Sequence, residues 1–351
     1  MGGSDVDQVL KVRQHRRIVQ SSEALDGGQG YIQQAATLPG ADAPAPAPRP
    51  AFECVVSDPK PFVSVVIPVY KDATILESCL DHLSNQTYPT DRFEVVVVDN
   101  GSSFDLAGLF ARRAGISVIH CPKPGSYAAR NRGVEAARGP IIAFTDADCQ
   151  PHRQWLEWGV AAMQQEPEIA VLGGHVEVVP RSNVRMSAAE LHQVLCAFRQ
   201  ERYLERQNFF ATANVFTYKS VFEHVGPFDE RLFSSGDLEW GQRAHARGCR
   251  MHYCADTVVR HPARTTMRQL FRKAARLTGG KFQLNRLRGE SQLRTLKDIL
   301  LRPLRRTLGD GPHVHLRWRD STRFLAVDWA LAAVRLLETV RLMAGGKPRR
   351  R

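Results

Sequence analysis

The feature that most constrains the fold is an alternation of short β-branched runs with helical patterns. Four runs, residues 63–69, 94–98, 117–119 and 141–144, consist largely of apolar residues and are as short as buried strands. Stretches with helical spacing separate them, for example residues 127–137. This alternation predicts an α/β fold with a Rossmann-like, mostly parallel sheet flanked by helices and joined by right-handed crossovers.

Polar residues stand where three of these runs end. Tyr70 and Asp72 follow the first, Asp99 follows the second, and Asp146 and Asp148 follow the fourth. Ligands of open α/β sheets bind beyond the carboxyl ends of the strands. We therefore expect these side chains to border one site at a single edge of the sheet.

The strongest chemical signal is the pair Asp146 and Asp148, which directly follows a buried strand. Two carboxylates at this spacing can approach one hard cation, Mg²⁺ or Mn²⁺, which often binds through one or two carboxylates and substrate phosphates. The alternative is a strand-ending turn whose Asp residues cap the next helix. The position after the strand favours the metal and diphosphate interpretation.

Four further residues are candidates, each with a structural alternative. Asp99 can accept an N–H of a pyrimidine or guanine ring, or can simply stabilise a turn. Arg130 follows small residues at a helix start and can bind phosphate, or can be a surface arginine. Asp237 can take a proton from a hydroxyl, or can cap a helix. His261 can be a third metal ligand, or can have only a structural role.

Seven segments in this order resemble glycosyltransferase family 2, a family of inverting enzymes with the GT-A fold. The segments are residues 63–70, 86–89, 97–102, 129–133, 145–148, 225–230 and 236–240. The resemblance covers roughly residues 62–263. It implies transfer of a sugar from a nucleotide-diphosphate sugar to a hydroxyl acceptor, with inversion and with a divalent metal, Mn²⁺ or Mg²⁺.

The resemblance also implies a role for individual residues. The nucleotide would contact Pro68, Val69, Tyr70 and Asp99, and Arg130 and Asp146 would lie by the donor. Asp148 would hold the metal, with His261 as a possible extra ligand, and Asp237 would be the catalytic base. The residues that would border the acceptor or donor sugar are Thr212, Asn214, Glu239 and Trp240. Asn131 would support the Arg130 loop.

Two departures from the family pattern bear on these roles. The family often has a second acidic residue where Asn100 stands, and usually a Glu-Asp pair where Gly236 and Asp237 stand. The second departure leaves Glu239 as the other candidate base. Asp237 is preferred, because Leu238 and Trp240 then keep the helix register of the family.

The C-terminal region differs in charge from the rest of the chain. The net charge is +12, yet residues 260–351 alone hold 23 Lys and Arg against six Asp and Glu. A basic helical face is expected from Arg264 to Arg276, followed by an apolar helix over residues 324–343 that four charges interrupt. This helix is too charged to span a membrane and suits a membrane surface. The alternatives are that it packs on the catalytic domain or forms a dimer.

These features predict an N-terminal flexible arm with an Ala/Pro linker (1–60), a catalytic domain (61–263) and a basic, amphipathic helical extension (264–351). Seven cysteines without a C-x-x-C pattern indicate a reducing compartment, so we expect a cytoplasmic protein peripherally attached to the cytoplasmic membrane face. The apolar, basic extension favours a lipid-linked acceptor, such as a precursor of a cell-surface or cell-wall polysaccharide.

Two other functions are compatible with parts of the sequence. A sugar-nucleotide nucleotidyltransferase shares the sheet type and the metal carboxylates, but a Gly-rich basic loop would be expected after its first strand, where residues 68–71 read Pro-Val-Tyr-Lys. A non-catalytic scaffold that binds membrane or nucleic acid would use the basic end. Nucleic acid is not expected as a partner, because no zinc pattern or RNA-binding aromatic motif accompanies the basic residues.

Overall fold

The computed structural model describes residues 58–70, 73–102, 106, 108, 113–166, 168–182, 185–309 and 312–349. The expected N-terminal arm lies outside these residues up to residue 57, as do Lys71 and Asp72.

The centre of the molecule is one eight-stranded sheet in the order β3-β2-β1-β4-β7-β6-β8-β5. Its strands are β1 (Val63–Val69), β2 (Phe93–Asp99), β3 (Ile116–His120), β4 (Ile141–Thr145), β5 (Gln150–Pro151), β6 (Ile169–Val179), β7 (Asn214–Tyr218) and β8 (Arg250–Pro262). The first four strands are parallel, as are β6 and β8. The mostly parallel α/β sheet expected from the sequence is therefore confirmed.

The sheet is mixed because two strands run against their neighbours. Strand β7 is antiparallel to both β4 and β6, and the short β5 is antiparallel to β8. The register pairs Asn214, the first residue of β7, with Thr145, the last residue of β4. Strand β7, from a distant part of the chain, therefore begins at the edge of the sheet where β4 ends, beside the turn that carries Asp146 and Asp148.

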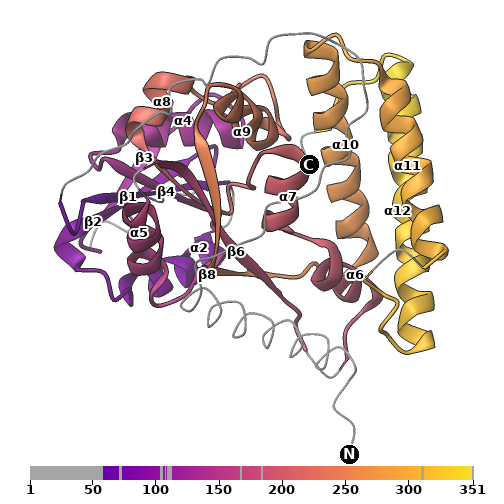
Figure 1. Ribbon diagram of the computed structural model, residues 1–351, viewed down its shortest axis with the longest axis horizontal. Coiled ribbons are helices and arrows are strands. Elements are labelled where there is room, and N and C mark those ends of the chain that lie inside the picture. The colour runs from indigo at the N-terminus through magenta and orange to yellow at the C-terminus, as the bar shows by residue number, and fades with distance from the viewer. Residues whose placement is uncertain are drawn as a thin grey trace, which may run out of the picture.

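Helices cover the sheet and bury its apolar faces (Figure 1). They are α2 (Ala73–Ser84), the 3-10 turn η1 (Thr90–Arg92), α4 (Ser126–Ala136), α5 (Trp155–Gln165), α8 (Lys219–Val225) and α9 (Gly236–Ala246). The register pairs Val69 with Asp99 and Asp99 with His120, so the ends of β1, β2 and β3 meet at one edge.

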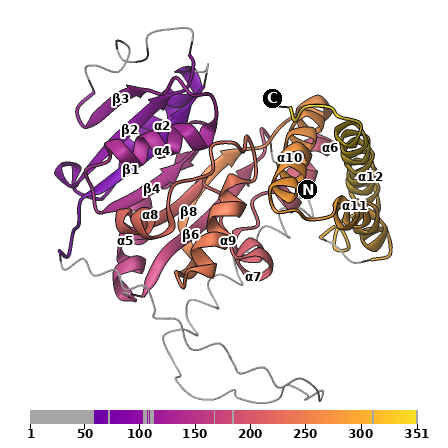
Figure 2. The ribbon, with the colours of Figure 1, turned by 90° about the horizontal axis from the view of Figure 1, so that it is seen from above.

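The remaining helices form a bundle at one side of the sheet, which Figures 1 and 2 show from two directions. The bundle contains α6 (Ala188–Cys196), α10 (Met267–Leu287), α11 (Gln292–Thr307) and α12 (Trp318–Met343), and the short α7 (Gln200–Gln207) lies between the bundle and the sheet. In both views α10 is nearer the sheet than α11 and α12 are.

The C-terminal helix is fastened to the bundle by a buried charged network. Asp328 of α12 is 2% exposed and accepts hydrogen bonds from Arg306 Nη1 of α11 (2.6 Å) and His192 Nε2 of α6 (3.1 Å). The Phe324 ring stacks between His192 and His313. One face of α12 therefore packs on α6 and α11. Because α6 lies within the range predicted as the catalytic domain, this agrees with the alternative that the helix packs on that domain. Among the described residues, no helix is long and apolar enough to cross a membrane.

Candidate active site

The residues predicted to contact the nucleotide meet at the ends of β1 and β2. Asp99 Oδ1 accepts hydrogen bonds from the backbone N–H groups of Ser102 (2.8 Å) and Gly101 (3.2 Å). Burial opposes the charge of Asp99, but these N–H groups hold its pKa below the usual value. The Tyr70 side chain is 38% exposed and its ring lies beside Gly101. An ionised acceptor and an exposed aromatic ring are thus neighbours, whereas Val69 is buried in the strand.

Asn100 links these residues to the segment before α4, a role that the sequence did not predict. Its side-chain amide donates to the carbonyls of Cys121 (3.1 Å) and Lys123 (2.7 Å), and its Oδ1 accepts from Gly125 N (2.7 Å). Gly125 directly precedes α4, so Asn100 fixes the segment that delivers Arg130. A carboxylate in its place could not donate to the two carbonyls, which gives a physical reason for the departure from the family pattern.

Arg130 and Asp146 form a close ion pair inside the site. Arg130 is 4% exposed, and its Nη2 lies 2.5 Å from Asp146 Oδ1. The neighbouring Asn131 exchanges hydrogen bonds with the backbone N–H and carbonyl of Phe228 (both 2.9 Å) and donates to Glu230. The motifs at residues 129–133 and 225–230 are therefore locked together, and Arg130 orients Asp146.

Asp148 faces His261 across the sheet edge. His261 Nε2 lies 3.4 Å from Asp148 Oδ2, and His261 Nδ1 lies 2.8 Å from the carbonyl oxygen of Pro262. Because that carbonyl can only accept, Nδ1 carries the proton, and the neutral ring directs the lone pair of Nε2 toward the carboxylate. Burial lowers the pKa of His261, which favours this neutral form. Two acceptors facing each other in this way fit a shared divalent cation.

Cys149 is also close, since ligand atoms of Asp146, Asp148 and Cys149 all lie within 4.8 Å of one another. Burial and the two carboxylates raise the pKa of the Cys149 thiol well above its usual value. A protonated sulfur is a poor ligand for Mg²⁺ or Mn²⁺. The oxygen and imidazole donors are therefore the ones that suit a hard or borderline cation here.

The candidate base, Asp237, is held by a tyrosine from the other half of the fold. Tyr127 Oη donates to Asp237 Oδ1 (3.0 Å), and Leu238 N donates to the same oxygen. Burial raises the pKa of Asp237 above its usual value, although Tyr127 and Arg130 act in the opposite direction. A carboxylate with a raised pKa is a better proton acceptor than a free one. The sequence did not suggest Tyr127, which lies 110 positions away.

Gly236 allows this contact. A Cβ at residue 236 would lie 2.6 Å from Cδ2 and Cε2 of the Tyr127 ring, closer than side chains tolerate. The acidic residue that the family usually has at this position would therefore displace Tyr127. The Tyr127–Asp237 hydrogen bond therefore depends on the glycine at residue 236.

Three other residues predicted to border the sugar make contacts within the protein instead. Glu239 pairs with Arg243 through two hydrogen bonds of 2.8 Å. Trp240 packs between aromatic rings and donates to the carbonyl of Gly226 (2.9 Å). Asn214 is fully buried; it accepts from Trp155 and donates to two backbone carbonyls. The structure thus places Asn214 and Trp240 in the interior, behind Asp237.

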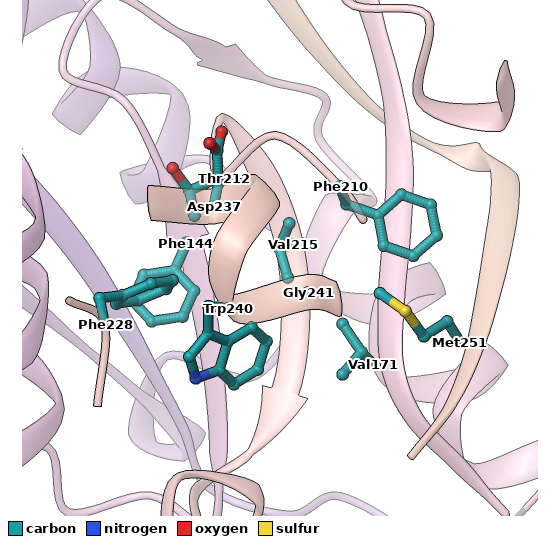
Figure 3. Close-up of a pocket in the computed structure, with 10 residues that line it drawn as sticks. All are labelled: Phe144, Val171, Phe210, Thr212, Val215, Phe228, Asp237, Trp240, Gly241 and Met251. Atoms are coloured by element: carbon teal, nitrogen blue, oxygen red, sulfur yellow. The ribbon is translucent and has the colours of Figure 1, made fainter. Parts of the chain in front are cut away.

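A small cavity of about 10 Å³ lies between these residues and the site. Figure 3 shows the oxygen atoms of Thr212 and Asp237 at one end of it and the rings of Phe144, Phe228 and Trp240 away from that end. Such a volume holds at most about one water molecule. A sugar is too large to enter it.

Comparison with known proteins places these features in a family. Residues 64–226 match glycosyl transferase family 2. The chain is 38% identical over 231 residues to the glycosyltransferase AglE of Haloferax volcanii, an alignment that covers 64% of this chain and 74% of that protein. It is 28% identical over 241 residues to the pre-mycofactocin glycosyltransferase of Mycobacterium tuberculosis, covering 65% of this chain and half of that protein.

Among solved structures, the chain resembles the mannosyltransferase PcManGT of Pyrobaculum calidifontis in complex with GDP-Man and Mn²⁺. The TM-score is 0.49 and the identity 20%, with 86% of this chain and 78% of the other covered.

Proposed function

The chain belongs to glycosyltransferase family 2, and on this basis we propose that it transfers a sugar from a nucleoside-diphosphate sugar to a hydroxyl acceptor with inversion, with the help of a divalent cation. One observation carries the proposal: the pair Asp148–His261, the ion pair Arg130–Asp146 and the half-buried Asp237 lie around one edge of the sheet. Two of these groups suit a metal–diphosphate, and the third suits a hydroxyl proton.

We assign the residues the following roles in this reaction. Tyr70 stacks on the nucleobase and Asp99 accepts its N–H, while Arg130 keeps Asp146 pointed at the donor. Asp148 and His261 would hold the cation, which would supply positive charge to neutralise the leaving diphosphate. Asp237 takes the proton of the acceptor hydroxyl as the oxygen attacks the anomeric carbon, and the nucleoside diphosphate leaves from the opposite face with the bonding electrons. Inversion follows from this single displacement.

Nucleotide binding tests the donor and metal part of the proposal. We expect calorimetry to detect one of UDP, GDP, dTDP and CDP, with Mn²⁺ required for tight binding. Asp148→Ala should abolish the Mn²⁺ dependence, whereas Asp81→Ala, which removes an exposed carboxylate on α2, should not. A folded native protein that binds none of the four nucleotides would overturn the proposal and favour a scaffold.

A second proposal concerns the location of the enzyme: attachment to the cytoplasmic face of an anionic membrane, near a lipid-linked acceptor for cell-surface or cell-wall polysaccharide. It is supported by apolar side chains left exposed on the outer helices: Leu293, Leu300 and Leu304 of α11, Leu308 directly after it, and Leu337, Val340 and Met343 of α12. Arg268, Arg272, Arg341 and Arg349 line a pocket of about 470 Å³ between α10 and α12, with Phe271 and Leu337 among its apolar residues. Apolar and basic groups together suit an anionic bilayer surface.

Vesicle flotation tests this location. The native protein should float with phosphatidylglycerol vesicles and less with phosphatidylcholine vesicles. The double variant Leu293→Asp and Leu337→Asp should stay in the dense fraction. Ile75→Asp, which charges an exposed apolar position on the catalytic domain, should float like the native protein. Native protein found entirely in the dense fraction would refute membrane attachment.

A further inference from the structure

The contacts of Phe198 link the candidate metal site to the first C-terminal helix. Phe198 stands between α6 and α7 with a φ of +48°, which side-chain-bearing residues seldom adopt. Its ring centroid lies 4.6 Å from that of His261, and Lys273 Nζ of α10 lies 4.7 Å from the same centroid. One aromatic ring therefore packs against both a candidate metal ligand and a cation of α10.

Two arginines accompany Lys273. Arg264 precedes α10 and Arg276 lies one turn beyond Lys273, and among the described residues none of these three cations forms an ion pair. Arg264 Nη1 is buried with no hydrogen-bond partner in the described part of the chain. Within the described residues, the hydrogen bond of Arg276 is a long contact of 3.4 Å with the Ser234 hydroxyl. Buried guanidinium nitrogens without acceptors are costly unless a ligand supplies the acceptor.

The electrostatics connect this cluster to the carboxylates of the site. Burial and the charges of Arg264 and Arg276 lower the pKa of Lys273 to about 7, and the charges of Asp148 and Asp146 act in the opposite direction. Burial likewise lowers the pKa of Arg264, opposed by Asp148. Three like charges that repel one another are stabilised when a multivalent anion lies between them.

We propose that Lys273, together with Arg264 and Arg276, binds the diphosphate of the donor from the side of α10, so that the first C-terminal helix completes the active site. This inference rests on the proposed function, because it assigns a second set of ligands to the same diphosphate. Lys273 and Arg264 interact electrostatically with Asp148, and Lys273 lies against the Phe198 ring that packs on His261, so these cations face the place where a diphosphate would bind the metal. In Figure 2 helix α10 also lies nearer the sheet than α11 and α12 do.

The same helix supports the loop that carries the candidate base. A Cβ at Gly280 would lie 2.5 Å from Cβ of Ser234 and 2.6 Å from its carbonyl oxygen, so α10 packs directly on the residues before Asp237. The extension therefore reaches the site at two points, the Phe198 ring that packs on His261 and the loop before Asp237. A helix that only attached the protein to a membrane would need neither contact.

The test compares charge removal at two neighbouring positions of α10 by calorimetry with inorganic pyrophosphate and with the nucleoside diphosphate that the native protein binds, each with Mn²⁺. Lys273→Met removes the charge but keeps an apolar stem against Phe198, and Lys273→Arg restores a charge. The control, Arg272→Met, removes a charge from an exposed residue of the other pocket. Because charge-assisted hydrogen bonds to phosphate are strong, Lys273→Met should raise the Kd of both ligands by roughly tenfold or more.

The outcomes separate this inference from the proposed function. Lys273→Arg should recover most of the lost affinity, and Arg272→Met should bind like the native protein. If the native protein binds both ligands and Lys273→Met binds them equally well, the α10 inference is wrong while the proposed function stands. Equal losses for Lys273→Met and Arg272→Met would also overturn it, because they would indicate only a general effect of net charge. If native protein binds neither ligand, both proposals fail.

Discussion

Removing the Tyr127 hydroxyl should move the pH dependence of catalysis. The phenol donates to Asp237 Oδ1 at 3.0 Å and thereby favours the ionised carboxylate, which burial disfavours. A hydrogen bond to a charged group contributes about 1.5–3 kcal/mol, and one pKa unit corresponds to about 1.4 kcal/mol. Tyr127→Phe should therefore raise the pKa of Asp237 by roughly one to two units.

The assay is the pH profile of kcat/KM for sugar transfer, or for donor hydrolysis, at saturating Mn²⁺. Because the base must be ionised, the acid limb of the profile should shift upward by the same amount, and the rate should recover at higher pH. Tyr218→Phe, which alters a buried tyrosine at the end of β7 with a 3.5 Å contact to Met163, should leave the limb in place. An unchanged acid limb in Tyr127→Phe, or one shifted to lower pH, would refute the role of Asp237 as the titrating base.

Three further changes have defined outcomes. Gly280→Ala should lower the free energy of unfolding by about 1–3 kcal/mol, because its Cβ would displace Ser234. It should also lower kcat, because Ser234 belongs to the loop that carries Asp237. Asp328→Ala should cost about 3–5 kcal/mol of unfolding free energy, because it leaves Arg306 buried without its partner. Asp237→Asn should raise Tm relative to the native protein at pH 8 and less so at pH 4, because a carboxyl with a raised pKa loses its stabilising contribution as pH rises through that value.

Matched variants control for these changes. Gly279→Ala places its Cβ 3.3 Å from Pro348 in the C-terminal segment rather than against the base loop, so it should change kcat little. Asp320→Ala breaks a more exposed pair with Arg323 and should cost at most about 1 kcal/mol. If these controls behave like the primary variants, the effects do not come from the contacts described.

The sequence allowed the first half of the fold to be predicted well because its signals are local. The four apolar runs became β1 to β4, and Asp99, Asp146 and Asp148 lie at their ends. The antiparallel β7 was not predicted, because its register with β4 and β6 depends on pairing between distant segments. Burial patterns within one strand do not reveal the direction of its neighbour.

The candidate site shows the same limit. The sequence indicated Asp148, His261 and Asp237 through their positions, but not the hydrogen bond from Tyr127 or the approach of Lys273. Tyr127 and Asp237 are more than a hundred positions apart. Lys273 lies on a helix whose basic residues had suggested only a membrane-binding surface. The basic face of α10 looked like one surface, whereas the fold turns Lys273 toward the site and Arg272 toward the pocket beside α12.

The most direct test of the proposed chemistry compares the native protein with Asp237→Asn in two measurements on the same preparation. These are the Kd of the cognate nucleoside diphosphate with Mn²⁺, and kcat for sugar transfer. We expect the Kd to stay near the native value and kcat to fall by at least about 10²-fold, as the loss of a general base requires. Near-native kcat in Asp237→Asn, or a loss of nucleotide binding equal to the loss of kcat, would contradict the assignment of Asp237 as the base.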